Sequence, residues 1–243
     1  MTGGSASEAT CHHLIVECTT VLFDLDGTLI DSQEAIVASY RHALSAFGLK
    51  ARAAAIKGWI GPPLEEGLAA LGVPPGGLAA ATAVYRDHFA EVGVDESELF
   101  DGVPQMLDAL TSAGVRLGLT TSKLQTFAES ILVRLGIREG FAAVAGTSLD
   151  GSRSSKEEVV ADALEALGRP HRPDVALVGD RGHDMLAATH HGIFPVGAAW
   201  GYGGRAELRR SGAAAVVETP SALTTLLLAR ATTCGVDGLP RRS

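Results

Sequence analysis

Cysteine and basic residues are scarce in this sequence, and each shortage narrows what the protein can do. The three cysteines are an odd number, lie near the chain ends and lack metal-ligand spacing, which argues against a disulfide framework. We therefore expect reduced thiols and a cytoplasmic protein. The 20 basic residues are outnumbered by 28 acidic ones, so no lysine- and arginine-rich stripe is available to neutralise the phosphates of a nucleic acid.

Long apolar runs are also missing. No stretch approaches the roughly 18 apolar residues that a membrane-spanning helix needs, which predicts that the protein has no membrane partner. Residues 1–18 are rich in Gly, Ser and Thr and lack the basic region and apolar core of a secretory signal, so we expect a flexible leader. The composition of residues 230–243 predicts a flexible tail.

The rest of the chain has the composition of a globular protein, with 46% hydrophobic and 20% charged residues. An apolar, β-branched run at residues 19–25 predicts a buried strand that ends in an Asp-Gly-Thr turn. Strands and helices then alternate, which favours an α/β fold: a Rossmann-like, doubly wound parallel sheet with helices on both faces. We predict further strands at 115–120, 142–145, 174–178, 194–196 and 213–217, and helices at 103–113, 124–135, 156–167, 182–191 and 222–228.

One interval, residues 32–99, interrupts this alternation. It carries only helical patterns, separated by Gly- and Pro-rich punctuation, and no strand is predicted within it. The predicted helices are at 35–47, 64–71 and 78–92. We therefore predict two domains: an α/β core at residues 19–31 and 100–229, and an inserted all-α cap at residues 32–99.

Polar side chains follow the ends of several predicted strands. In an open α/β sheet the ligand site lies off the carboxyl ends of the strands, so these side chains are expected to converge there. The residues are Asp24, Asp26, Thr121, Ser122, Lys156, Asp180 and Asp184. Four carboxylates in a small space require a cation, and a set of oxygen ligands without His or Cys suits Mg²⁺. Taken singly, Asp180 could instead be a helix N-cap and Lys156 a solvated surface charge.

The order of these residues resembles the motifs of the haloacid dehalogenase (HAD) superfamily. Residues 23–29, Phe-Asp-Leu-Asp-Gly-Thr-Leu, are similar to its first motif in the phosphatase form. Thr121 matches the second motif, Lys156 the third, and the Gly-Asp-x-x-x-Asp sequence at 179–184 the fourth. The resemblance covers roughly residues 19–228 and implies a phosphoric monoester hydrolase.

The resemblance also implies a role for each matching residue. Asp24 would be the nucleophile that attacks phosphorus, and Asp26 the acid and base. The Asp24 carboxylate, the Asp26 backbone carbonyl and Asp180 would hold Mg²⁺, with Asp184 binding it directly or through water. Thr121 and Lys156 would bind the phosphoryl group, and Ser122 is expected to be a further substrate-binding residue. Dehalogenases and phosphonate-cleaving members lack an aspartate at position 26, so its presence points to ester hydrolysis.

Several segments resemble the branch of the superfamily whose members are called phosphoglycolate phosphatases or 5'-nucleotidases. The cap segment at 58–64 resembles a loop that reaches the active site, so Gly61 is either a substrate contact or part of a plain turn. Lys123 either approaches the substrate or is an exposed cation at a helix start, and we expect the exposed cation. Arg181 and His183 are expected to support the Mg²⁺ loop or to point to solvent.

The expected partner is a small phosphorylated metabolite, and the protein is expected to be a monomer or homodimer. The identity of the ester is left open by the motifs, because selectivity depends on cap side chains. A sugar phosphomutase of the β-phosphoglucomutase type shares the same motifs and cap position and is an alternative. A more remote one is a receiver domain that stores a phosphoryl group on aspartate, which Asp26 and the large helical insert oppose.

Overall fold

The computed structural model describes residues 18–231, and its centre is a six-stranded sheet in the order β5-β4-β1-β6-β7-β8. Every neighbouring pair of these strands is parallel. The strands are β1 (Thr20–Phe23), β4 (Arg116–Leu124), β5 (Phe141–Thr147), β6 (Val175–Gly179), β7 (Phe194–Ala198) and β8 (Ala215–Val217). The predicted α/β class is therefore confirmed, with the first strand at the middle of the sheet.

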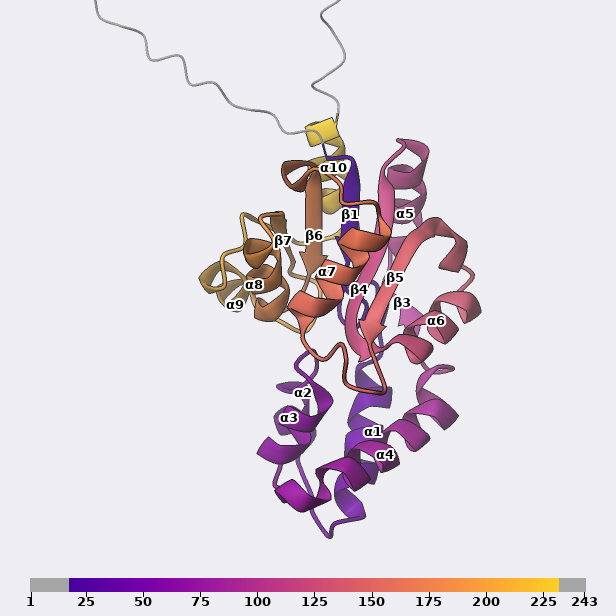
Figure 1. Ribbon diagram of the computed structural model, residues 1–243, viewed down its shortest axis with the longest axis vertical. Coiled ribbons are helices and arrows are strands. Elements are labelled where there is room, and N and C mark those ends of the chain that lie inside the picture. The colour runs from indigo at the N-terminus through magenta and orange to yellow at the C-terminus, as the bar shows by residue number, and fades with distance from the viewer. Residues whose placement is uncertain (1–17, 232–243) are drawn as a thin grey trace, which may run out of the picture.

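Helices cover both faces of this sheet (Figure 1). Because successive side chains of a strand point to opposite faces, Val21 and Phe23 of β1 pack on one side and Leu22 on the other. The first face is covered by α5 (Val103–Ser112), α6 (Gln125–Arg134) and α10 (Pro220–Ala231), and the second by α7 (Lys156–Ala166) and α8 (Gly182–His190). The short turns η3 (Arg138–Gly140) and η4 (Arg172–Asp174) precede β5 and β6.

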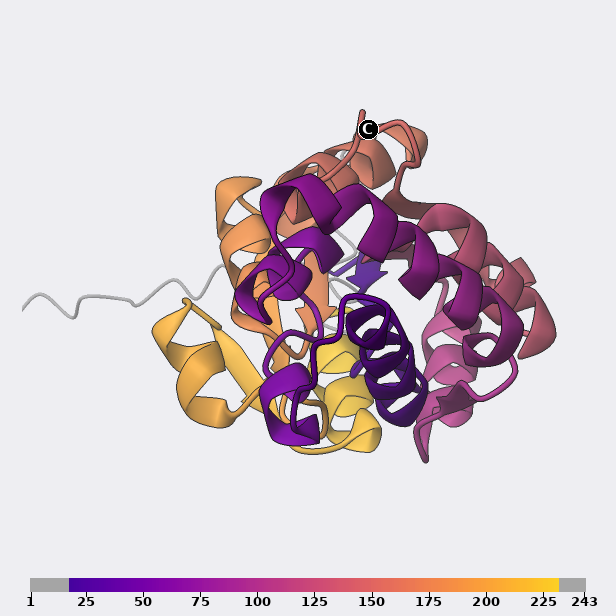
Figure 2. The same ribbon diagram turned by 90° about the horizontal axis from the view of Figure 1, so that it is seen from below.

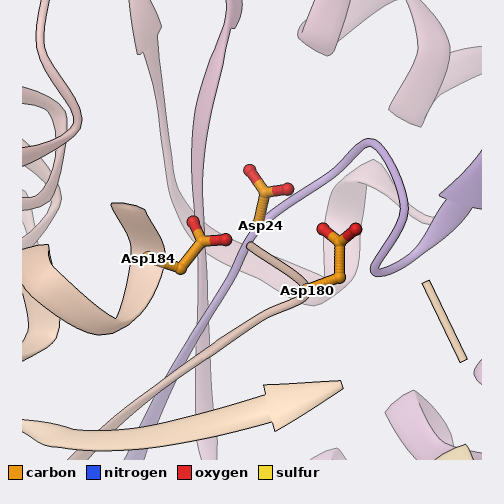
Figure 3. Close-up of side chains that lie close together, drawn as sticks. All are labelled: Asp24, Asp180 and Asp184. Atoms are coloured by element: carbon orange, nitrogen blue, oxygen red, sulfur yellow. The ribbon is translucent and has the colours of Figure 1, made fainter. Parts of the chain in front are cut away.

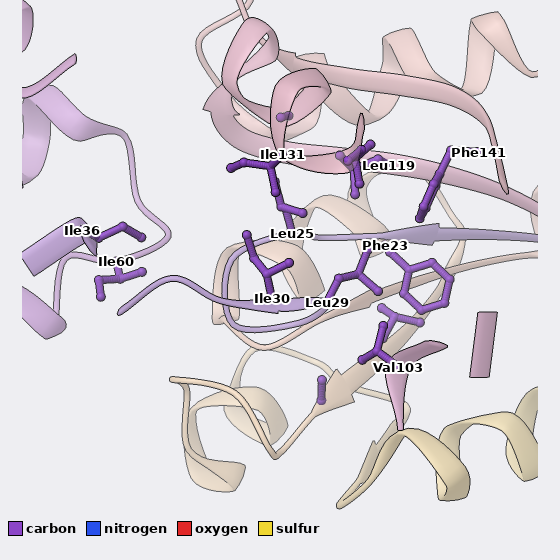
Figure 4. Packing of buried hydrophobic residues seen from close by; sticks show 14 of the residues in the cluster. Phe23, Leu25, Leu29, Ile30, Ile36, Ile60, Val103, Leu119, Ile131 and Phe141 are labelled. Carbon is purple, nitrogen blue, oxygen red and sulfur yellow. The ribbon is translucent and has the colours of Figure 1, made fainter. Parts of the chain in front are cut away.

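The helices of residues 32–99, the cap segment, lie beyond the carboxyl ends of the strands (Figures 1 and 2). They are α1 (Gln33–Ser45), α2 (Ala53–Lys57), α3 (Leu64–Ala70) and α4 (Leu78–His88), with the 3₁₀ turn η1 (Pro75–Gly77) and the π-helical turn η2 (Phe89–Gly93). Figure 4 shows Ile36 and Ile60 of the cap segment next to each other, and both belong to the same hydrophobic cluster as Leu25, Leu29 and Ile30, which follow β1. Shared apolar packing therefore joins the cap segment to the sheet.

Some short elements were not anticipated. A two-stranded antiparallel pair, β2 (Ile30–Asp31) with β3 (Glu98–Leu99), joins the two ends of the cap segment, so the prediction of no strand within 32–99 was wrong at its last two residues. The helices α2 and α9 (Arg205–Arg210) were also missed. Elements of two to six residues are too short to show an apolar period, and tertiary packing stabilises them instead. Ile56 of α2 and Leu208 of α9 are both fully buried.

Other boundaries shifted by a few residues. The strand predicted at 115–120 continues to Leu124, because the polar sequence Thr-Ser-Lys at 121–123 stays extended at the rim of the sheet. Within residues 18–231 no helix is long and apolar enough to cross a membrane. The predicted leader, apart from residue 18, and all but the first two residues of the predicted tail lie outside the described residues.

Candidate active site

The register of the sheet brings three chain segments to one level at its carboxyl edge. Phe23, the last residue of β1, pairs with Leu119 of β4 and with Val178 of β6. The backbone amide of Asp24 then donates to the carbonyl of Val178 at 2.9 Å. The residues that follow Phe23, Leu119 and Val178 are therefore neighbours in space, as the sequence predicted.

Three carboxylates converge at this edge (Figure 3). One oxygen of each of Asp24, Asp180 and Asp184 lies within 4.8 Å of the others, and all three residues are buried. Asp180 comes from the end of β6 and Asp184 from the first turn of α8. Such a buried acidic cluster would be strongly repulsive without a cation, so its geometry fits a bound metal ion.

Backbone and side-chain donors fix the orientation of Asp180. Its Oδ2 accepts hydrogen bonds from the amides of Tyr202 (2.7 Å) and Gly203 (3.3 Å), and its Oδ1 accepts one from Thr28 Oγ1 (3.3 Å). The N-cap of α8 is the next residue, Arg181, so the alternative of Asp180 as a helix cap is wrong. Its carboxylate is held in place by these donors and does not cap the helix.

The turn after β1 leaves no room for a side chain beside Asp180. Gly27 has φ +86°, and a Cβ at this position would overlap Asp180 Oδ2. The glycine of the first motif is therefore needed both for the turn and for the close approach of the two loops.

Lys156 sits inside the acidic cluster rather than on the surface. Its Nζ lies 2.6 Å from Asp24 Oδ1 and 2.8 Å from Asp184 Oδ1, and it donates to the Thr120 carbonyl at 2.8 Å. The lysine opens α7, which is fixed at its start by a capping box formed by Ser155 with the third helical residue. The alternative of a solvated surface charge is wrong.

The electrostatic environment shifts the pKa of each group in the cluster. Burial raises the pKa of Asp24 to about 7, although the ammonium of Lys156 opposes the rise. Burial, together with the other two carboxylates, raises the pKa of Asp180 well above its usual range. Burial alone would lower the pKa of Lys156, but Asp184 and Asp24 raise it above its ordinary value, so the lysine stays charged.

The charges of the rim are not balanced by protein groups alone. With Asp26, the rim carries four carboxylates: Lys156 contacts Asp24 and Asp184, Lys123 contacts Asp26, and neither lysine contacts Asp180. Two unit negative charges are left, which one divalent cation would neutralise. The available ligands are carboxylate oxygens, the donors that hard divalent cations prefer. The site therefore fits such a cation.

Asp26 and Lys123 form a pair beside the metal cluster. Lys123 Nζ lies 3.1 Å from Asp26 Oδ1 and 3.9 Å from the ring centroid of Phe89 in the cap segment. Ser32 Oγ also donates to Asp26 Oδ1. Both donors use Oδ1, so Oδ2 keeps no hydrogen bond within the described part of the chain and is left for a reacting group.

The expectation that Lys123 is an exposed cation at a helix start was wrong. Its side chain is only 7% exposed, because β4 continues through this position and α6 starts two residues later. The pairing of β4 with β5 is irregular between Thr120 and Leu124, and Lys123 lines the cavity beside Asp26. The contact joins Lys123 to a residue far away in the chain, and no local pattern in the sequence predicts it.

Thr121 and Ser122 lie where they were expected. Thr121 is almost fully buried, and its hydroxyl oxygen accepts a hydrogen bond from the Lys123 amide at 3.1 Å. The hydroxyl proton is therefore available to a ligand. Both Thr121 and Ser122, together with Asp24 and Asp26, line a cavity of about 190 Å³ between the rim and the cap segment.

The loop between α2 and α3 brings the cap segment to this cavity. Gly61 in the loop lines it with φ +110°, and a Cβ at this position would lie 2.7 Å from Cε1 of His183. Arg181 donates to the backbone carbonyls of Ile60 and Gly58. The expectation for Arg181 was therefore incomplete, because its guanidinium connects the loop after β6 to the cap segment.

The family model described as haloacid dehalogenase-like hydrolase matches residues 21–198. The chain belongs to this family. A protein from Mycobacterium tuberculosis named tyrosine-protein kinase PtkA is 45% identical over 184 residues, which are 75% of this chain and 62% of that protein. A 5'-nucleotidase from Pseudomonas aeruginosa is 37% identical over 193 residues, which are 78% of this chain and 86% of that protein.

Solved structures give the same result. One described as a predicted phosphatase from Clostridium acetobutylicum has a TM-score of 0.84 at 32% identity, and the match covers 88% of this chain and 99% of that one. These findings confirm the predicted HAD membership and fold and support a hydrolase with phosphatase relatives. This chain spans only about 62% of the length of the tyrosine-protein kinase relative.

Proposed function

We propose that this HAD hydrolase is a Mg²⁺-dependent phosphatase that hydrolyses small phosphate monoesters through a phosphoryl group carried on Asp24. The observation that carries the proposal is the pair of carboxylates in the turn after β1. Asp24 lies against Lys156 and the acidic cluster, whereas Asp26 is held through one oxygen by Lys123 and Ser32. The two aspartates thus have different surroundings, as a nucleophile and a proton carrier require.

In the first half-reaction an Asp24 carboxylate oxygen attacks phosphorus. As that bond forms, the bond from phosphorus to the ester oxygen breaks, and the proton on Asp26 passes to the leaving oxygen. Lys156 offsets negative charge between the Asp24 carboxylate and the phosphoryl oxygens, and the Thr121 hydroxyl donates to one of them. Bound Mg²⁺ would supply charge neutralisation and orientation of the phosphoryl group, held by Asp24, the Asp26 backbone carbonyl, Asp180 and Asp184.

In the second half-reaction Asp26 acts as the base. Its carboxylate takes a proton from water, the water oxygen bonds to phosphorus, and the bond between phosphorus and Asp24 breaks. Inorganic phosphate leaves, and both aspartates return to their starting states. The α/β core at residues 19–31 and 100–229 would supply this chemistry, and the cap at 32–99, hinged where β2 pairs with β3, would exclude bulk water.

The substrate is a small phosphorylated metabolite under this proposal. The 5'-nucleotidase relative supports nucleoside monophosphates, and the resemblance to the phosphoglycolate phosphatase branch supports that acid ester. Purified protein with Mg²⁺ should release phosphate from a panel of monoesters, and chelation should stop the release. No phosphate from any ester, with the fold intact by circular dichroism, would overturn the proposal. Transfer to a second sugar without phosphate release would identify a phosphomutase instead.

A second candidate is phosphoryl transfer to a tyrosine hydroxyl, favoured by the 45% identity to the PtkA relative. In that reaction an acceptor hydroxyl would take the place of water in the second half-reaction. The two functions differ in the fate of the phosphoryl group. Label from a phosphorylated donor would appear on an added protein acceptor in a transferase, and in free phosphate in a phosphatase.

A further inference from the structure

Aromatic side chains are scarce in this chain but gather around one cavity. The sequence has 7 Phe, 3 Tyr and 2 Trp residues. Five of these rings line the cavity above Asp24 and Asp26: Tyr40, Trp59, Tyr85, Phe89 and Phe127. The buried apolar residues of the cap segment away from the cavity are largely aliphatic, and they include Leu44, Ile56 and Leu68.

The five rings form two layers. Tyr40 and Phe89 are buried, whereas Trp59, Tyr85 and Phe127 keep part of their surface exposed. The buried rings contact the exposed ones. Tyr85 lies nearly parallel to Phe89 (centroids 6.1 Å, planes 9° apart), and Tyr40 meets the edge of Tyr85 at 5.1 Å. On the other side Phe127 is 5.3 Å from Phe89. The contacts of Tyr85 and Phe127 with these buried rings restrict the orientations of both side chains.

The five rings together are called the aromatic wall, and this wall begins beside Asp26. Lys123, which holds Asp26, also lies over the Phe89 ring, so the wall starts where a leaving group would depart. From there it continues through Tyr85 to the part of the cavity beyond the phosphoryl position. The Tyr85 hydroxyl has no hydrogen-bond partner among residues 18–231, and it is therefore available to a polar group of a ligand.

We propose that the leaving group of the substrate carries a planar aromatic ring, which binds against Trp59, Tyr85 and Phe127. This inference rests on the proposed phosphatase function and narrows its substrate class. Flat rings gain most from stacking on aromatic side chains, whereas a short acid such as glycolate would leave this wall uncovered. A nucleobase and a phenol both supply such a ring, and the experiment must distinguish them.

The first test compares esters that differ only in the ring. With Mg²⁺, kcat/KM for a nucleoside 5'-monophosphate should exceed that for ribose 5-phosphate by about tenfold or more if a nucleobase is the ring. If the ring is a phenol, kcat/KM for O-phosphotyrosine should fall when a ring of the aromatic wall is removed, as in the second test. Equal kcat/KM values for the nucleotide and ribose 5-phosphate, with no effect of the wall on O-phosphotyrosine, would overturn the inference.

The second test removes a ring. Tyr85→Leu should lower the ratio of kcat/KM for the ring-bearing ester to that for ribose 5-phosphate or phosphoserine by about tenfold. Phe47→Leu is the matched control, since Phe47 packs in the same cap segment but does not line the cavity, and its ratio should equal that of the wild type. Equal losses in both variants would assign Tyr85 a structural role and contradict the inference.

A competing outcome concerns Arg86. This residue lines the same cavity and forms no ion pair within residues 18–231, so it is available to a carboxylate on the leaving group. If phosphoglycolate is the fastest ester and Arg86→Gln abolishes that preference, the ring inference is wrong although the phosphatase function stands. If no ester is hydrolysed, the phosphatase function fails. The Kd values of a nucleoside monophosphate and of ribose 5-phosphate with Mg²⁺ then decide the ring inference.

Discussion

The rim of the sheet and the cap segment face the same cavity but position their side chains in different ways. At the rim, Asp24, Thr121 and Asp180 follow strands whose register is fixed by backbone hydrogen bonds. In the cap segment, Tyr40 and Tyr85 are placed by the packing of α1 against α4. The rim is charged and buried, whereas the side of the cavity formed by the cap segment is largely apolar. Under the proposed function, sheet register would determine the reaction and helix packing would determine which leaving group fits.

The largest expected effect comes from removing the proposed nucleophile, which tests whether the rim controls the reaction and not the choice of substrate. Asp24→Asn should reduce turnover of every ester to the background rate, because Asp24 is the carboxylate that is proposed to carry the phosphoryl group. Steady-state phosphate release on several esters measures this effect. Circular dichroism serves as the folding control. A loss confined to some esters would mean that the rim takes part in substrate choice.

The buried charges of the rim predict a large effect on stability. Lys156→Met should cost about 3–5 kcal/mol of unfolding free energy, because it leaves Asp24 and Asp184 without their cation in a buried site. Urea denaturation in the absence of Mg²⁺ measures this cost. The double variant Asp24→Asn with Lys156→Met should recover part of the loss, since it removes one unpaired charge. No recovery would contradict the assigned charge balance.

Mg²⁺ should stabilise the rim by a smaller amount. At about one hundred times the Kd the ion should add about 2.7 kcal/mol to the unfolding free energy, and Asp180→Asn should largely remove this gain. The pKa of Asp24 rises from 3.8 to about 7 in the metal-free fold, so its bound proton stabilises that fold most at low pH. This contribution is lost as the pH rises through about 7.

The gain from Mg²⁺ should therefore be larger at about pH 8 than at about pH 5, where protons compete for the carboxylates. Thermal unfolding with and without the ion at both pH values checks this. An equal gain at the two pH values would show that the ion binds elsewhere.

The smallest expected effect comes from changing Lys123, which contacts both Asp26 of the rim and Phe89 of the cap segment. Lys123→Met should lower kcat for esters of poor leaving groups by about tenfold, because Asp26 loses a charged hydrogen-bond partner. An ester of a good leaving group, such as p-nitrophenyl phosphate, needs less proton donation and should be affected less. Lys123→Arg should restore part of the activity. Equal losses on both kinds of ester would mean that Lys123 does not act through Asp26.

The contrast between sheet register and helix packing also explains why the rim residues could be predicted from the sequence and the cavity-lining residues of the cap segment could not. The apolar run before Asp24 and the alternation of strands and helices predict a parallel sheet, and strand ends meet at one edge of such a sheet. The positions of Asp24, Thr121, Lys156, Asp180 and Asp184 therefore followed from periodicity together with the family motifs. No comparable rule relates positions scattered over separate helices.

Other features depended on tertiary contacts that leave no local pattern. Lys123 was predicted to be exposed because a polar residue after a strand usually starts a helix, but Asp26 and Phe89 keep it at the rim. The pairing of β2 with β3 joins residues far apart in the chain. The aromatic wall is assembled from α1, α4, η2, α6 and the loop after α2, and no spacing in the sequence relates these segments.

The most direct test of the central claim is to trap the phosphoryl group on the protein. Acid quenching of the wild type during turnover with Mg²⁺, followed by borohydride reduction and peptide mass spectrometry, should convert position 24 to homoserine. The same treatment without substrate should leave Asp24 unchanged. Turnover at the full rate with no modification of Asp24, or with the modification at another residue, would contradict the account.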